Sequence, residues 1–212
     1  IGTGVANVAE WGSFNLTFAI ATLVSLDSGT VYGLTVQMMG VAFMIYVGMG
    51  TATSVRVAER FGRGDGVGVR EASRLGVVAS TLLGLILATT LILLRDPIAV
   101  TWLNGSEVAS EGAHLVPQLS LMLAAVAFVT LFDGLQAVGS MALRAQGVVW
   151  IPTAIHVGSY VFVMLPLCWW LALHTSYGVW GVIIGISIAS IVAGVGQVLA
   201  LDAKLSVDDN EL

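Results

Sequence analysis

The sequence predicts an all-α membrane protein with six transmembrane helices. Of its 212 residues, 57% are hydrophobic and 10% are charged, a composition far more apolar than that of a water-soluble domain of this length. Six apolar segments are long enough to cross a hydrocarbon core, which needs about 20 helical residues. They are Thr3–Leu26, Val31–Val55, Leu75–Leu94, Leu115–Leu143, Ile151–Leu173 and Gly178–Leu201. Residues 1–212 are therefore expected to form one transmembrane bundle.

All six segments are expected to be helices. A bilayer offers no water to unpaired peptide groups, so a spanning segment is either a helix or part of a closed barrel. The segments lack the two-residue alternation of barrel strands. The first segment has no basic start and is followed within five residues by the second, so we expect a spanning helix and not a secretory signal.

The connection between the second and third segments contains the letters FGRGDGVG, Phe61 to Gly68. Its glycines do not fit the dinucleotide pattern G-x-G-x-x-G, and no Lys-Ser/Thr pair follows as in a phosphate-binding loop. A tight turn between two helices is expected instead.

The last two segments carry residues that affect helix shape and packing. Pro152 and Pro166 lie in the fifth, where each removes a backbone donor and permits a bend. The sixth has small residues at every fourth position, which allow another helix to approach closely. These are Gly181, Gly185, Ala189 and Ala193.

The basic residues predict the orientation in the membrane. Seven of the eight Lys and Arg residues fall on one side of six alternating crossings, and Arg95 alone falls on the other. The positive-inside rule then places both termini in the cytoplasm of a multi-pass protein of the cell membrane. The seven are Arg56, Arg60, Arg63, Arg70, Arg74, Arg144 and Lys204.

Several function classes are disfavoured. The basic connection is interspersed with acidic residues, so no nucleic-acid partner is expected. The single cysteine, Cys168, cannot form a disulfide within the chain. His156 lies in the fifth segment without a second ligand at metal-binding spacing, so a satisfied interior histidine is favoured over a proton relay. No serine lies in a hydrolase-type motif, so we expect neither an enzyme nor a cofactor.

Two carboxylates inside the apolar segments are the leading site candidates. Glu10 and Asp133 interrupt segments that are otherwise uncharged. A charge at the bilayer centre costs about 2.5 to 3.5 kcal/mol even on lenient scales, so such residues normally face an interior cavity and serve a function. The structural alternative is a neutral acid that fastens two helices together through hydrogen bonds.

The depths of the two acids allow one shared site. Glu10 is 16 residues from the outer end of its segment and Asp133 is 18 from the outer end of its own, or roughly 24 and 27 Å at 1.5 Å per residue. Polar residues recur near each acid at helical spacing: Asn7 on the first segment, and Thr130 and Gln136 on the fourth. Their side chains are expected to support a sodium ion bound at the two acids, or a proton on either one.

Two stretches resemble the C-terminal lobe of multidrug and toxic compound extrusion (MATE) transporters. They are TATSVRVAERFGRGDGVGVREASRLG after the second segment and LFDGLQAVGSMALRAQG around Asp133. The likeness covers essentially the whole chain and depends on the order of the motifs, beginning with a glutamate early in the first helix. Val148 departs from the pattern, because the family commonly has an aspartate there.

The resemblance implies one six-helix lobe of a twelve-helix antiporter, which exports drugs, toxins or organic cations in exchange for sodium ions or protons. Glu10 and Asp133 match the family's coupling acids in the seventh and tenth helices. The implied partners are the lipid bilayer, small organic cations, and either an N-terminal six-helix lobe or a second copy of this chain. We expect the chain to be a fragment, a truncated frame or half of a split assembly, and rank a homodimeric half-transporter after these.

Two other functions stay open. A flippase for lipid-linked sugars has a related fold, but the six segments contain no Lys or Arg to bind a pyrophosphate. A non-transporting membrane partner would use the two acids only to fasten helices.

Overall fold

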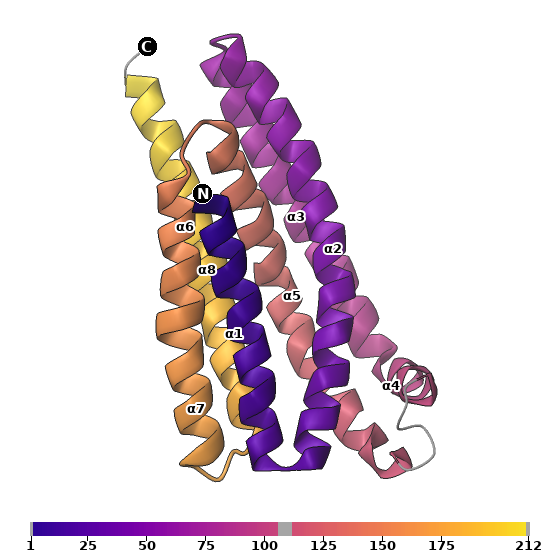
Figure 1. The fold of residues 1–212 in the computed structure, drawn as a ribbon. Helices are drawn as coiled ribbons and strands as arrows, with labels where there is room; N and C mark the ends of the chain where they lie inside the picture. The colour runs from indigo at the N-terminus through magenta and orange to yellow at the C-terminus, as the bar shows by residue number, and fades with distance from the viewer. Residues whose placement is uncertain (1, 106–111, 211–212) are drawn as a thin grey trace.

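Helices account for almost every residue in the computed structural model, which describes residues 2–105 and 112–210 (Figure 1). Their bounds are α1 (Gly2–Val24), α2 (Leu26–Gly62), α3 (Gly66–Leu93), α4 (Arg95–Asn104), the 3-10 turn η1 (Ala113–Leu115), α5 (Val116–Ala145), α6 (Trp150–Val157), the π-helical turn η2 (Gly158–Met164), α7 (Leu165–Leu173) and α8 (Val179–Asn210). Within these ranges the chain has no strand, so the predicted all-α class is confirmed.

Five stretches of the described chain are long and apolar enough to cross a membrane: Leu26–Gly62, Gly66–Leu93, Ala113–Ala145, Trp150–Leu173 and Val179–Val207. Six were expected. The remaining predicted segment corresponds to α1, whose 23 residues are long enough to cross; it contains Asn7, Glu10 and Asn15 and is not among these five stretches. It packs alongside the other helices in the bundle (Figure 1).

Helix boundaries differ from the predicted segments mainly where capping residues act. The side chain of Ser25 accepts a hydrogen bond from the backbone N–H of Ser28, so α2 begins directly after α1 with almost no loop. One short helix was not predicted. Pro97 lies in the first turn of α4, and Ala99 and Leu103 are buried, which seats this helix against α5.

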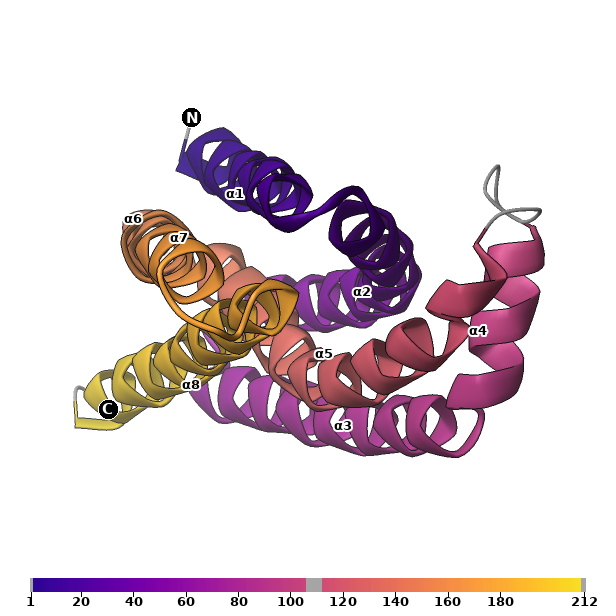
Figure 2. The same cartoon turned by 90° about the horizontal axis from the view of Figure 1, so that it is seen from below.

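The centre of the bundle is α5, which packs against α2, α3 and α8 (Figures 1 and 2). Its sequence explains this position, because buried residues occur on most of its circumference, among them Leu119, Leu123 and Val126. The predicted ladder on α8 packs closely against its neighbours. A Cβ added at Gly185 would lie 2.5 Å from the Sγ of Cys168 on α7.

The fifth predicted segment is one continuous rod made of three parts. α6 leads into the π turn η2 without a break, and η2 leads into α7. Pro166 stands at the start of α7, where the missing N–H of a proline disturbs the hydrogen-bond ladder, and a wider turn immediately before it accommodates that loss. Both Ser159 and Tyr160 within η2 are buried.

The predicted turn between the second and third helices is confirmed, and it is shorter than the FGRGDGVG stretch. α2 ends at Gly62 and α3 begins at Gly66. Gly64 has a φ of +69°, a left-handed conformation that glycine adopts without steric cost. Asp65 caps α3 by accepting from the backbone N–H of Gly68 at 2.8 Å and from Nη1 of Arg60 at 2.9 Å.

Replacing Asp65 with Asn is expected to lower the unfolding temperature by a few degrees or less at neutral pH. The bonds from Gly68 and Arg60 hold the pKa of the Asp65 carboxyl below its usual value, so the folded state favours the carboxylate. A depressed folded pKa stabilises the protein above the unfolded pKa of about 3.9, and this contribution is lost as pH falls. The difference between the two proteins should therefore shrink below about pH 4.

Thermal unfolding in detergent over a range of pH values measures this effect. Glu71→Gln is the matched control, because Glu71 is exposed on α3 and takes no part in the cap. If Asp65→Asn and Glu71→Gln behave alike at every pH, the cap does not stabilise the turn.

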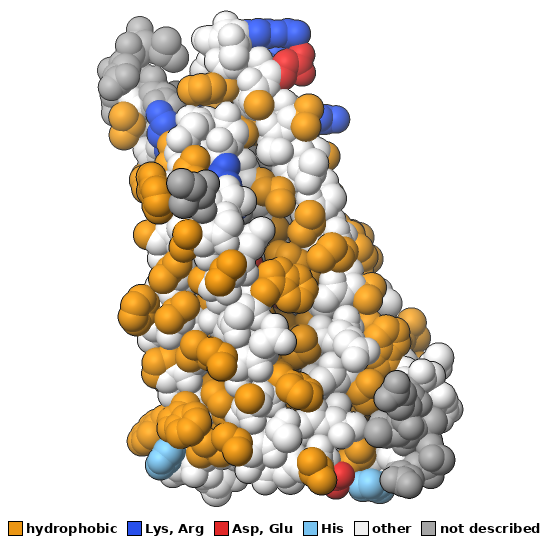
Figure 3. Space-filling model, viewed as in Figure 1, with side chains coloured by type: hydrophobic (Ala, Val, Ile, Leu, Met, Phe, Trp, Pro, Cys, Tyr) orange, Lys and Arg blue, Asp and Glu red, His pale blue; other side chains and the backbone are white. Residues whose placement is uncertain are grey.

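The Lys and Arg side chains visible in Figure 3 gather at one end of the molecule. The start of α1 and the end of α8 lie at the same end as the α2–α3 turn (Figure 1). Figure 3 shows Lys and Arg at that end, His near the opposite end and a wide hydrophobic zone between them. This distribution matches the segregation of basic residues that the sequence predicted.

Candidate functional site

Glu10 lies on the inner face of α1. That face carries small and polar residues at helical spacing: Ala6, Glu10, Ser13 and Thr17 are all buried. The Glu10 side chain is 8% exposed. The helix therefore carries a carboxylate into the bundle interior at a depth where apolar side chains surround it.

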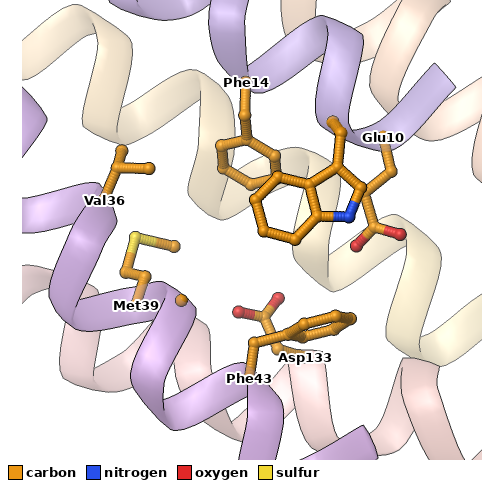
Figure 4. Close-up of a pocket in the computed structure, with 8 residues that line it drawn as sticks. Glu10, Phe14, Val36, Met39, Phe43 and Asp133 are labelled. Atoms are coloured by element: carbon orange, nitrogen blue, oxygen red, sulfur yellow. The ribbon is translucent and has the colours of Figure 1, made fainter. Parts of the chain in front are cut away.

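Asp133 reaches the same space from α5. It is 6% exposed, and it lines one cavity together with Glu10. Figure 4 shows both carboxylates pointing into this cavity, between α1 and α2. The other lining residues are Trp11, Phe14, Val36, Met39, Gly40 and Phe43. The structure thus brings the two predicted acids, 123 positions apart in the chain, to one largely apolar chamber.

Gln136 links Glu10 in the cavity to Tyr160 on η2 through hydrogen bonds. Its Nε2 donates to Oε1 of Glu10 at 2.9 Å, and its Oε1 accepts a hydrogen bond from the hydroxyl of Tyr160 on η2. Because its amide oxygen is used by Tyr160, Gln136 presents an N–H donor to Glu10 and not an oxygen. This side chain therefore stabilises the Glu10 carboxylate by hydrogen bonding.

His156 of α6 lies on the other side of the same carboxyl group. Its Nε2 is 3.8 Å from Oε2 of Glu10, and its Nδ1 is 2.7 Å from the carbonyl oxygen of Pro152. Gln197 of α8 also contacts this unit, with its Nε2 3.0 Å from the Pro152 oxygen. His156 is 4% exposed, so this arrangement is buried.

Not all of the predicted supporting residues reach the site. Asn7 is exposed on α1 and does not line the cavity. Thr130 is buried, and its hydroxyl donates to the carbonyl of Ala127 in its own helix. Of the three, Gln136 alone has a described hydrogen bond to one of the acids.

Two residues near Glu10 were missed as site components. Tyr160 was not singled out from the sequence, and His156 was interpreted as a satisfied interior histidine. The contact of Nδ1 with Pro152 agrees with that interpretation for one ring nitrogen. The other nitrogen faces Glu10 across a sequence separation of 146 residues, which leaves no local pattern to detect.

The chamber suits a small cation or a proton. Its volume is about 40 Å³, and one water-sized probe occupies about 10 to 15 Å³, so it has room for a few waters or one small ion. Two carboxylates and few other polar groups face this space, so the arrangement attracts positive charge.

Comparison with known proteins gives the family. The MatE family matches residues 3–170, which include Glu10, Asp133, Gln136 and His156. This chain belongs to the MatE family. The resemblance seen in the sequence motifs is confirmed.

The curated relatives of this MatE chain include two bacterial proteins named "Probable multidrug resistance protein NorM". The one from Caulobacter vibrioides is 29% identical over 195 residues, covering 91% of this chain and 39% of the relative. The one from Bradyrhizobium diazoefficiens is 33% identical over 183 residues, covering 86% of this chain and 39% of the relative. The chain thus spans about two fifths of the length of these relatives.

Solved MATE structures share the fold of this MatE chain. A crystal structure of a MATE protein in complex with MaL6 superposes with a TM-score of 0.90 at 14% identity. The match covers 99% of this chain and 46% of that one. The described helices therefore correspond to just under half of a MATE transporter chain.

Proposed function

We propose that this chain serves in cation-coupled export of drugs, toxins or organic cations, with Glu10 and Asp133 binding the coupling ion. The observation that carries the proposal is the chamber shared by the two carboxylates. Buried acids are costly in a membrane interior, and two of them around one small space give a site whose negative charge is lowered when a sodium ion or proton binds. The names of the NorM relatives support drugs as the cargo.

The ion site can drive movement because it joins separate helices. Glu10 belongs to α1 and Asp133 to α5, and the chamber is completed by α2. With both acids ionised and the chamber empty, the carboxylates repel each other. A bound cation offsets that repulsion and draws α1, α2 and α5 together, so the two states of the site favour different helix positions.

A second six-helix bundle is part of the proposal. Alternating access needs two bundles that move against each other. The coverage of 39% of the NorM relatives and 46% of a solved MATE chain supports a partner bundle of similar size. A second copy of this chain is the alternative partner.

The proposed location is the cell membrane, with both chain ends on the cytoplasmic side. The clustering of Lys and Arg at the end that holds the α2–α3 turn supports this orientation through the positive-inside rule (Figure 3). A lipid-linked sugar flippase is the weaker alternative, because carboxylates and apolar groups line the chamber and would not attract a pyrophosphate.

Transport in proteoliposomes tests the function. The protein is reconstituted alone and together with the N-terminal part of the Caulobacter relative, and efflux of ethidium, a fluorescent organic cation, is followed. We expect an opposing sodium or proton gradient to accelerate efflux severalfold, and an ionophore that dissipates the gradient to abolish the acceleration. The intact NorM relative is the positive control. If it shows gradient-driven ethidium efflux while efflux from every preparation of this chain is independent of the gradient, the proposal is contradicted.

A further inference from the structure

The histidine beside Glu10 has a defined tautomer. A carbonyl oxygen can only accept hydrogen bonds, so the 2.7 Å contact between Nδ1 of His156 and the Pro152 oxygen places the proton on Nδ1. The Nε2 of Gln197 lies 3.0 Å from the same oxygen and 3.0 Å from Nδ1; with the proton on Nδ1, its N–H donates to the oxygen. The neutral ring therefore turns an unprotonated Nε2 towards Glu10.

The space between Nε2 and the carboxyl group is suited to a proton. At 3.8 Å, the separation between Nε2 of His156 and Oε2 of Glu10 is about an ångström longer than a hydrogen bond and too short for an intervening water. Two lone pairs face each other when Glu10 is ionised. A proton on Oε2 converts this repulsion into an O–H donor directed at Nε2, and a small approach of α1 and α6 completes the bond.

We propose that His156 is a specificity-determining residue that makes the Glu10 site select a proton over a sodium ion. The inference rests on the proposed function and names its coupling ion. Hard cations prefer oxygen ligands, and the imidazole nitrogen is a poor one for them. Gln136 also supplies no oxygen ligand for sodium, because its amide oxygen is committed to Tyr160 and only its N–H faces Glu10.

The proton balance is simple. Glu10 takes one proton from the solvent, and that proton lies on Oε2 or passes to Nε2, which leaves either a neutral pair or a carboxylate beside an imidazolium; the net charge of the pair is the same in both forms. The ionisable groups near His156 are Glu10 on α1, Arg144 on α5 and Tyr160 on η2. Asp133 on α5 shares the cavity with Glu10. α8 contributes the uncharged Gln197.

The test uses His156→Asn, which keeps an amide donor for the Pro152 oxygen and removes the nitrogen that faces Glu10. Efflux of ethidium is driven either by a pH gradient without sodium or by a sodium gradient at equal pH, and the ratio of initial rates gives the ion preference. We expect the wild-type protein to prefer protons. In the variant, the ratio of proton-driven to sodium-driven rates should fall about tenfold, which corresponds to the loss of one hydrogen bond of about 1.4 kcal/mol.

His174→Asn is the matched control, because this histidine is exposed at the far end of α7. A second readout does not depend on transport. The infrared C=O stretching band of protonated Glu10 is identified by its loss in Glu10→Gln. The frequency of this band should shift in His156→Asn and stay unchanged in His174→Asn.

The outcomes separate this inference from the proposed function. A wild-type protein driven as well by sodium as by protons overturns the inference and leaves the export function standing, and so does an unchanged ratio in a folded His156→Asn. If no preparation transports, the export proposal fails and the infrared band decides: a shifted band supports the Glu10–His156 hydrogen bond, and an unshifted band overturns it.

Discussion

Replacing Asp133 with Asn, or Glu10 with Gln, is expected to reduce gradient-driven efflux at least tenfold in proteoliposomes. Each amide keeps the size of the side chain and removes one of the two negative charges that favour binding of a cation or proton in the chamber. The double variant should be about as impaired as either single one, because residues that act as a unit show non-additive losses. Initial rates with and without an imposed gradient measure the effect.

Downhill exchange of ethidium in the absence of a gradient should survive in these variants, because the coupling ion and not the cargo is lost. Their unfolding temperatures should not fall, since a buried carboxylate costs stability in a membrane interior. Glu71→Gln again serves as the control acid outside the site. Gradient-driven efflux at the wild-type rate in both single variants would show that the acids only fasten helices.

Replacing Gly181 with Ala is expected to destabilise the protein by about 1 to 3 kcal/mol, the usual range for overpacking a close contact. A Cβ at this position would lie 2.5 Å from the carbonyl carbon of Leu171 and 2.7 Å from the backbone nitrogen of Ala172. These are backbone atoms of α7, so relief requires the whole helix to move. The affected contact holds α7, and therefore η2 and Tyr160, against α8.

The control is Gly48→Ala on α2, where an added Cβ would meet nothing within 4 Å. Alanine is the better helix former by about 0.5 to 1 kcal/mol, so this change should leave stability unchanged or raise it slightly. Unfolding temperatures in detergent compare the two variants. Equal shifts would mean that α7 and α8 are not in the close contact that the structure shows.

The sequence predicts the acids of the site because their signal is local. Glu10 and Asp133 stand out within their own apolar segments, and the cost of a charge in lipid needs no knowledge of the fold to be applied. The two acids lie at similar distances from the outer ends of their segments, which is compatible with a shared site, and in the structure they line the same chamber. Their part in coupling stays a prediction until the variants are measured.

The supporting residues were harder to predict because helical spacing alone does not fix a side chain's direction. At about 100° per residue, Asn7 lies about 60° from Glu10 around α1, whereas Ala6 lies about 40° away on the other side. The helix buries the face of Ala6, Ser13 and Thr17, so Asn7 falls outside it. Packing of α1 against neighbouring helices therefore determines that the face with Ala6, and not the face with Asn7, is buried beside Glu10.

The partners from η2 and α6 could not be found from periodicity. The wider π turn changes the angle between successive side chains, so Tyr160 is not where an ideal helix would place it. The missed helix α4 has a different cause: its ten residues are too few to give the apolar pattern of a spanning segment.

The length of α2 has a practical consequence. Its 37 residues extend about 56 Å at 1.5 Å per residue, against a hydrocarbon thickness of about 30 Å. The helix is longer than the hydrocarbon core requires, and Arg63, which follows its last residue and has an exposed side chain, is expected to lie outside the lipid tails. A fluorophore or epitope tag attached there therefore disturbs the bundle little, and its accessibility in sealed cells reports which way the protein faces.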